Sequence, residues 1–193
     1  MITSMSASEK FRREGEIIGQ LIVRYGEMEL DLCRCIAAGN DDFNSTLKAM
    51  FRERSEGSRI KFAKTEGVKV YSHLGTELAA AFHEAIEAVR FCLHIRNRYA
   101  HRQFYNDESS GMLALVNVEE LAKSTTVIND LSELTVQHLT KDVLEKQQQY
   151  FLYTRACIEF VNCEGRFLRG RLKNRVFKRP EKLERPPEHA RIV

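Results

Sequence analysis

The residues whose types and spacing could perform chemistry lie at positions 96–101, in the order Arg-Asn-Arg-Tyr-Ala-His. Histidine exchanges protons near neutral pH, so His101 is able to take a proton from the 2′-hydroxyl of RNA or to protonate the leaving oxygen. Arg96 is able to bind a phosphate and to stabilise the charge that develops on it. An arginine and a histidine are therefore the side chains that cleavage of RNA without a metal requires.

The spacing of five residues limits how these two side chains cooperate. On an ideal helix it corresponds to about 140° of rotation and roughly 7.5 Å of rise. Arg96 and His101 reach one phosphate only if the arginine extends along the helix or if the helix loosens near His101. Asn97 lies four residues before His101, where it could hydrogen-bond the imidazole and fix its tautomer. One histidine does not easily carry out both proton transfers, and a symmetric dimer would supply a second one.

A structural role is the competing interpretation of the same residues. Arg96 would pair with a carboxylate of the first helix, such as Glu27 or Glu29. His101 would end its helix, where a cation interacts favourably with the helix dipole. The residues alone leave both interpretations open.

Residues 96–101, at the end of a long helix in a helical chain, resemble the Arg-x4–6-His motif of the HEPN superfamily. The polar residue directly after the arginine is typical of that motif. The resemblance implies a small helical bundle that dimerises with both motifs facing a shared cleft, and a metal-independent endoribonuclease of the toxin and defence class. The site residues assigned in this way are Arg96, Asn97 and His101 for catalysis and Arg98 and Arg102 for RNA binding. No metal and no cofactor is expected.

The resemblance also implies partners, which are an RNA substrate, a second copy of the chain and an antitoxin protein. In toxins paired with a nucleotidyltransferase-like antitoxin, a tyrosine stands two residues after the histidine. Here that position is Gln103, and the nearest tyrosine is Tyr105, so we do not expect modification by such a partner. Other superfamily members bind RNA, a nucleotide or a protein without cleavage, and a non-catalytic binding or regulatory module is the alternative function.

A helix over residues 77–101 is needed to position the motif, and the apolar pattern predicts it. Apolar residues recur there at steps of three and four in two adjacent stripes, which give a wide apolar face. We therefore expect this helix to be central. The stripes consist of Phe82, Ile86, Val89 and Leu93, and of Ala85, Ala88, Cys92 and Tyr99.

A first long helix is predicted over residues 8–37. It carries a narrow apolar seam that is typical of a helical bundle. The seam comprises Ile18, Leu21, Tyr25, Met28, Leu32 and Cys35. A third interpretation of the chain is a structural protein that dimerises through this seam. Gly19 and Gly26 lie on one face of the helix and either permit close approach of another helix or are tolerated there at a cost of about 1 kcal/mol each.

The remaining pattern predicts shorter elements and one last long helix. We expect short helices at about 42–54, at 59–63 closed by Gly67 and at 118–123, a β-hairpin of residues 103–105 and 112–116, and a final helix at 141–168 capped by Thr140. Residues 124–134 are ambiguous. The fold class is therefore all-α, an up-and-down helical bundle like that of HEPN proteins with a small β-hairpin inserted after the central helix. It forms one domain, residues 1–170, before a basic, proline-containing and poorly ordered tail, residues 171–193.

Composition limits the remaining classes of function. Residues from Arg166 onward carry a net charge of +7, and the preceding part of the chain carries −4, since the whole chain carries +3. The tail is suited either to neutralise phosphates or to serve as a solubilising end. The five cysteines have no zinc-finger spacing, which favours reduced thiols. With no signal peptide and no stretch approaching about 18 apolar residues, we expect a cytoplasmic protein without membrane contact.

Overall fold

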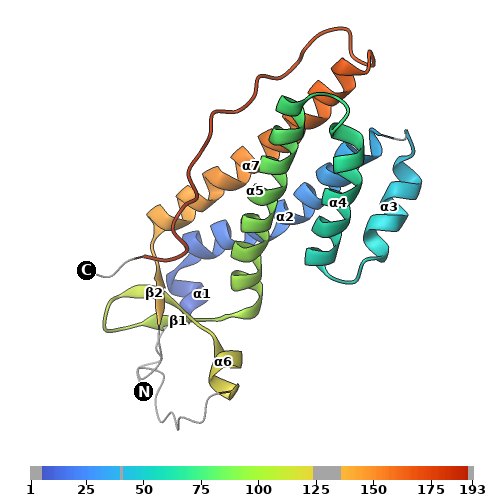
Figure 1. The fold of residues 1–193 in the computed structure, drawn as a ribbon. Coiled ribbons are helices and arrows are strands. Elements are labelled where there is room, and N and C mark those ends of the chain that lie inside the picture. The colour runs from blue at the N-terminus through green and yellow to red at the C-terminus, as the bar shows by residue number, and fades with distance from the viewer. Residues whose placement is uncertain (1–5, 40, 124–135, 191–193) are drawn as a thin grey trace. The chain divides into compact units, whose positions relative to one another are not determined.

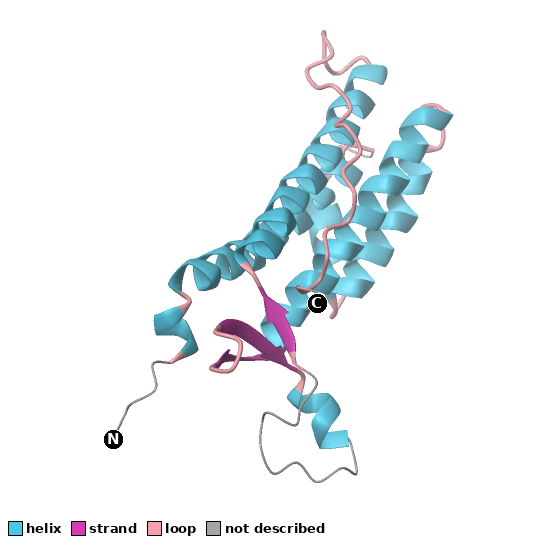
Figure 2. Cartoon of the chain, turned by 90° about the vertical axis from the view of Figure 1, so that its left-hand side faces the viewer, coloured by secondary structure: helices cyan, strands magenta, loops and turns pink. Residues whose placement is uncertain are grey.

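The computed structural model describes residues 6–39, 41–123 and 136–190 of the chain, and most of them are helical (Figure 2). The elements in chain order are α1 (Ala7–Lys10), α2 (Arg12–Ala37), α3 (Phe43–Arg52), α4 (Glu56–Tyr71), α5 (Thr76–His101), β1 (Gln103–Asp107), β2 (Met112–Val116), α6 (Val118–Lys123), β3 (Gln137–Leu139) and α7 (Lys141–Leu168). A mostly helical chain with a β-hairpin after its central helix is confirmed. The ambiguous stretch at 124–134 lies outside the described residues.

The chain divides into two compact units. Figure 1 labels the helices and strands along the chain. One unit contains residues 1–22, 95–149 and 186–193, and we call it the sheet unit. The other contains residues 23–94 and 150–185, and we call it the helical unit. The helices α2, α5 and α7 each contribute residues to both units. The motif at 96–101 belongs to the sheet unit.

The sheet has the strand order β1-β2-β3, and both pairs are antiparallel. In the predicted hairpin, Gln103 pairs with Val116 and Asp107 with Met112, and Gly111 adopts a positive φ of 68° in the turn. Residues 113–116 of β2 are buried, as expected for a central strand. The third strand, β3, was not predicted, because its three residues are held by their pairing with β2 and carry no local pattern of their own.

The apolar stripe of α5 is confirmed in the helical unit. Phe82, Ile86 and Val89 are each at most 2% exposed. The Phe82 ring lies 4.9 Å from the ring of Tyr71 between centroids. The sequence predicted that the helix ends at Gly67, but α4 continues through Gly67 to Tyr71. Phe82 covers Gly67, so the glycine provides room for the ring of Phe82 inside the helix.

The two glycines of α2 that were expected to permit the close approach of another helix do not do so. Gly19 and Gly26 are exposed, and a Cβ added at either would meet no atom within 4 Å. Close contacts of helical glycines occur instead at Gly67, under Phe82, and at Gly165, where an added Cβ would lie 2.7 Å from Cε1 of Tyr71, and Gly39 after α2 lies equally close to Val70. Gly19 and Gly26 are thus tolerated surface glycines of α2.

The seam of α2 is buried within the single chain. Its six residues have exposed fractions between 0% and 7%. A dimer that forms through this seam would require the surface to be free, so the interpretation of the chain as a dimer built on the seam is wrong.

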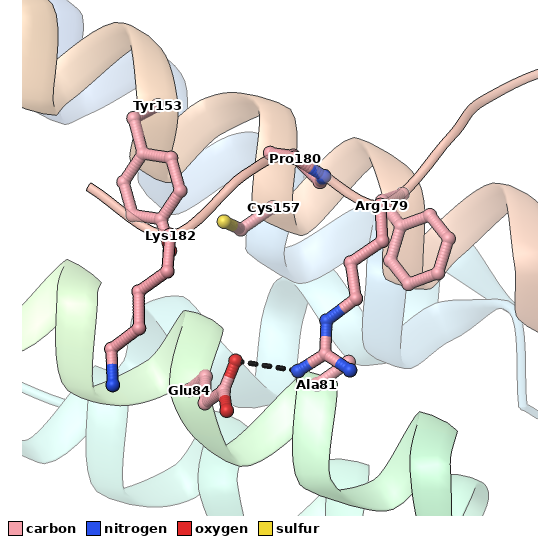
Figure 3. A pocket seen from close by; sticks show the side chains of 8 residues that line it. Ala81, Glu84, Tyr153, Cys157, Arg179, Pro180 and Lys182 are labelled. Atoms are coloured by element: carbon pink, nitrogen blue, oxygen red, sulfur yellow. Dashed lines mark hydrogen bonds and ion pairs between the residues drawn. The ribbon is translucent and has the colours of Figure 1, made fainter.

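The first part of the tail, residues 171–185, makes specific contacts within the helical unit, although a poorly ordered tail was expected. Figure 3 shows Arg179 reaching from the tail to Glu84 of α5, with 2.7 Å between Nη2 and Oε2. Arg175 pairs with Glu164 at 3.0 Å, and the Arg185 guanidinium lies 5.4 Å from the ring centroid of Phe91. Basic residues of the tail thus each contact a particular side chain of the helices.

Candidate functional site

The Arg-x-x-x-x-His element forms the last turns of α5. The helix remains α-helical through His101, and β1 begins two residues later at Gln103. The loosening of the helix that would bring Arg96 and His101 to one phosphate does not occur before His101. The ideal separation of about 140° and roughly 7.5 Å between these two positions therefore applies.

Asn97 interacts with the arginine and not with the histidine. Nη1 of the half-buried Arg96 donates a hydrogen bond to Oδ1 of Asn97 over 2.9 Å. Within the described part of the chain, no hydrogen bond joins Asn97 to His101. The side chain proposed to fix the imidazole tautomer thus orients the guanidinium group instead.

The two carboxylates considered as partners of Arg96 are engaged elsewhere. Glu29 accepts a hydrogen bond from Arg59 over 2.9 Å, and Glu27 accepts one from Arg155 over 2.9 Å. The pairing of Arg96 with either carboxylate stays a prediction.

His101 is the last residue of α5, and its side chain is exposed. It makes no hydrogen bond or ion pair with any residue that the structure describes. An imidazole in this position can approach a substrate without first breaking a contact inside the protein. It lies in the last turn of α5, where the structural interpretation places it.

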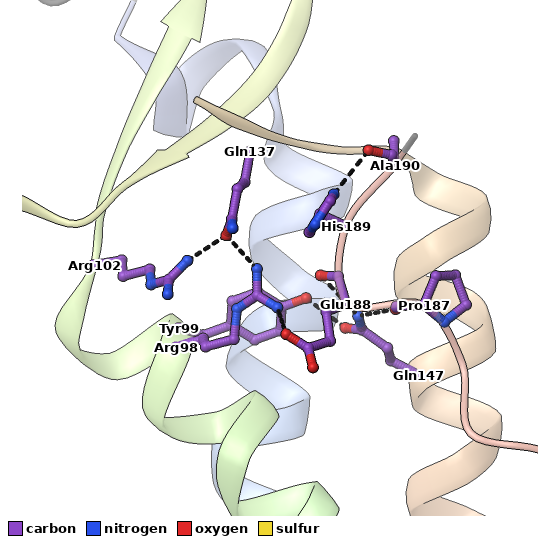
Figure 4. A network of polar contacts seen from close by, with 9 residues as sticks. All are labelled: Arg98, Tyr99, Arg102, Gln137, Gln147, Pro187, Glu188, His189 and Ala190. Atoms are coloured by element: carbon purple, nitrogen blue, oxygen red, sulfur yellow. Dashed lines mark hydrogen bonds and ion pairs between the residues drawn. The ribbon is translucent and has the colours of Figure 1, made fainter. Parts of the chain in front are cut away.

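Arg98 and Arg102, the residues assigned to RNA binding, enter a polar network (Figure 4). The side chain of Arg98 is only 4% exposed and pairs through Nη1 with the carboxylate of Glu188. Nη2 of Arg98 and Nη1 of Arg102 both donate to Oε1 of Gln137. Burial, followed by the charge of Arg102, lowers the pKa of Arg98, and Glu188 opposes this shift. Arg98 is thus covered by the C-terminal segment of the chain.

The same segment is fixed by a second set of contacts through Gln147 of α7. The Tyr99 hydroxyl donates to Oε1 of the fully buried Gln147. Nε2 of Gln147 in turn donates to the backbone carbonyl of Pro187 over 2.9 Å and to that of Glu188 over 3.4 Å. Burial is the main cause that raises the pKa of Tyr99. Tyr99 therefore acts as a scaffold residue within the motif.

A separate polar cluster links the hairpin turn to β3. Nε2 of His138 lies 2.7 Å from Oδ2 of Asp107, and the hydroxyls of Ser109 and Ser110 donate to the same carboxylate over 2.6 and 2.7 Å. The pKa of Asp107 is lowered, first by the hydrogen bond from Ser109 and next by His138. Both serines face the carboxylate and not the imidazole, so the cluster is not a nucleophile with its base. It holds the sheet together.

Other site chemistries find little support in the described parts of the chain. In these ranges no group of three or more His, Cys, Asp or Glu residues is arranged to hold a metal ion. All five cysteines are free thiols. The pocket of Figure 3 is small, about 150 Å³, and Arg179 and Glu84 at its edge neutralise each other. No helix of the described residues is sufficiently long and apolar to span a bilayer.

Comparison of this chain with protein families, with curated proteins and with solved structures finds no match. The assignment of a function therefore depends on the residues of the chain itself. The contacts of Gln137, Gln147 and Glu188 with the motif were missed from the sequence, because partners 35 to 90 residues apart leave no local signal.

Proposed function

We propose that the protein is a HEPN-type, metal-independent endoribonuclease of the toxin and defence class. It acts in the cytoplasm as a homodimer whose two motifs form a composite site, and an antitoxin protein is its further partner. The observation that carries the proposal is the state of the motif at the end of α5. His101 is exposed without a partner among the described residues, and the Arg96 guanidinium is oriented by Asn97.

In the proposed reaction, His101 takes the proton of the 2′-hydroxyl. The 2′-oxygen attacks the adjacent phosphorus, and the bond from phosphorus to the 5′-oxygen breaks. The leaving oxygen takes a proton from a histidinium, which leaves a 2′,3′-cyclic phosphate and a 5′-hydroxyl. Arg96 binds the phosphate and stabilises the additional negative charge of the transition state.

The geometry of a straight helix supports a composite site. Arg96 and His101 of one chain point about 140° apart. A second chain related by a two-fold axis offers a His101 to the Arg96 of the first, and the reverse, and it supplies the second imidazole for the other proton transfer.

Cleavage of a mixed RNA pool in the presence of EDTA tests the catalytic proposal. We expect the wild type to leave 2′,3′-cyclic phosphate ends and His101→Ala to be slower by about 100-fold or more. His83→Ala is the matched control, because His83 is an exposed histidine of the same helix outside the motif. Equal cleavage by wild type and His101→Ala would contradict the assignment.

Mixing two inactive variants tests the composite site. After subunit exchange between Arg96→Ala and His101→Ala, half of the dimers are mixed, and each mixed dimer brings the one Arg96 to the one His101 of the other chain but lacks the second imidazole. We therefore expect measurable activity to return, at most about a quarter of the wild-type activity. A site built within one chain would recover nothing.

The alternative function is a non-catalytic module that binds RNA, a nucleotide or a protein. One observation favours it, namely that Arg98 and Arg102 are held by Gln137 and Glu188 and are not displayed for a substrate. If the folded, dimeric wild type cleaves no RNA, the alternative replaces the nuclease.

A further inference from the structure

The C-terminal residues 186–190 lie against the motif within the sheet unit. Glu188 contributes a carboxylate to Arg98, and the backbone N–H of Ala190 donates to the carbonyl oxygen of His138 in β3 over 2.8 Å. Figure 4 shows these contacts together with those of Gln147. A short acidic segment thus covers an arginine of the candidate site.

The group that it covers has the character of an anion site. The two guanidinium groups of Arg98 and Arg102 share one amide oxygen of Gln137, which is neutral, and Glu188 supplies a negative charge to Arg98. Nε of Arg98 is buried, and no described residue accepts a hydrogen bond from it. A guanidinium binds a phosphate through two N–H groups in the same way as it binds a carboxylate, so a backbone phosphate can take the place of the Glu188 carboxylate.

The segment also has the character of a displaceable cover. The side chain of Glu188 is 42% exposed, whereas that of Arg98 is 4% exposed. The other recorded hydrogen bonds of residues 187–190 to the rest of the sheet unit use their backbone atoms. The contact of Glu188 with Arg98 is made by charged side chains, so a competing anion can replace it directly.

We propose that Arg98 and Arg102 form a binding site for a backbone phosphate of RNA and that Glu188 occupies this site in the free protein. The C-terminal segment is then an autoinhibitory latch, and RNA binding displaces it. This inference deepens the proposed function, because it names the regulation of the same site, and it concerns binding and not cleavage.

The test measures the affinity for a fluorescein-labelled 2′-O-methyl RNA oligonucleotide, which cannot be cleaved by attack of a 2′-hydroxyl. We expect Glu188→Gln to bind roughly tenfold more tightly than the wild type, because the variant removes the competing charge. Glu184→Gln is the matched control, since Glu184 is an exposed carboxylate of the same tail and the variant has the same net charge. Its affinity should change by less than about twofold.

Two results would overturn the latch. One is an unchanged affinity in Glu188→Gln, and the other is an equal gain in Glu184→Gln, which would indicate a general charge effect. Hydrogen exchange of the wild type decides the matter if Glu188→Gln does not fold. Saturating oligonucleotide should accelerate exchange of the Ala190 amide, which donates to His138 in the free protein, and an unchanged rate would refute displacement. Because the probe is not cleaved, the latch can hold although the nuclease proposal fails.

Discussion

Gly67→Ala should destabilise the protein, although replacement of glycine by alanine normally stabilises a helix. Gly67 lies inside α4, where alanine would add about 1 kcal/mol of helix stability. A Cβ at this position would lie 1.9 Å from Cζ of Phe82, about 1.5 Å closer than the 3.4 Å at which ordinary contact begins. The ring has no free space to retreat into, because Phe82 is 2% exposed and packs on Tyr71, which is 1% exposed.

The cost of forcing an additional carbon into a packed core is typically 1–3 kcal/mol, and the size of the overlap argues for about 3. With the gain in helix propensity subtracted, we expect Gly67→Ala to lose about 2 kcal/mol. Gly26→Ala is the matched control in α2, because its Cβ would meet no atom within 4 Å. It should gain about 0.8 kcal/mol.

Thermal unfolding followed by circular dichroism separates the two variants. In a chain of this size, 1 kcal/mol shifts the melting temperature by about 2–4 °C. Gly67→Ala should therefore melt about 4–8 °C below the wild type and Gly26→Ala about 2–3 °C above it. A Gly67→Ala protein as stable as the wild type would refute the packing of Phe82 on α4 and, with it, this support for α5.

Three further predictions concern charged side chains. Arg59→Ala leaves Glu29, whose side chain is 7% exposed, without its cation. We expect the free energy of unfolding, measured in urea, to fall by about 2–3 kcal/mol. Arg13→Ala breaks an exposed ion pair and should lower the free energy of unfolding by less than about 0.5 kcal/mol. Burial raises the pKa of Glu29 despite Arg59, so the wild type should lose stability relative to Glu29→Gln as the pH rises above about 4.5. For Asp107 the pH dependence has the opposite sign, because a serine hydroxyl in the turn and then His138 lower its pKa. The wild type should lose its stability advantage over Asp107→Asn as the pH falls below about 3.8. An advantage that persists at low pH would contradict this prediction.

Helices and strands in which apolar residues recur at a regular spacing could be predicted from the sequence. Helices expected at 77–101 and 141–168 occur at Thr76–His101 and Lys141–Leu168, because their apolar faces recur over six turns or more and decide the burial without help from distant residues. The hairpin at 103–116 was predicted for a similar reason, since alternation and turn residues act locally.

Features that depend on distant partners could not be predicted. Gly67 and Gly26 look alike in sequence, and only the approach of Phe82 distinguishes them. Within the candidate site, the residue types of Arg96 and His101 suggested the chemistry, but the direction of Asn97 and the contact of Arg98 with Glu188 depend on the fold. Side-chain pairing across 90 residues is a tertiary property that no local pattern encodes.

The helical period explains why neighbouring residues of one motif have different roles. With Arg96 as the reference, His101 lies at about 140° around the axis and Arg98 at about 200°. Arg98 meets Gln137 and the C-terminal segment, and Arg102, directly after the helix, meets Gln137 as well, whereas His101 is exposed. A loss of activity in a variant of Arg98 can therefore come from the scaffold. A loss at His101 with an unchanged melting temperature comes from the chemistry, and it is the His101 result that decides between nuclease and binding module.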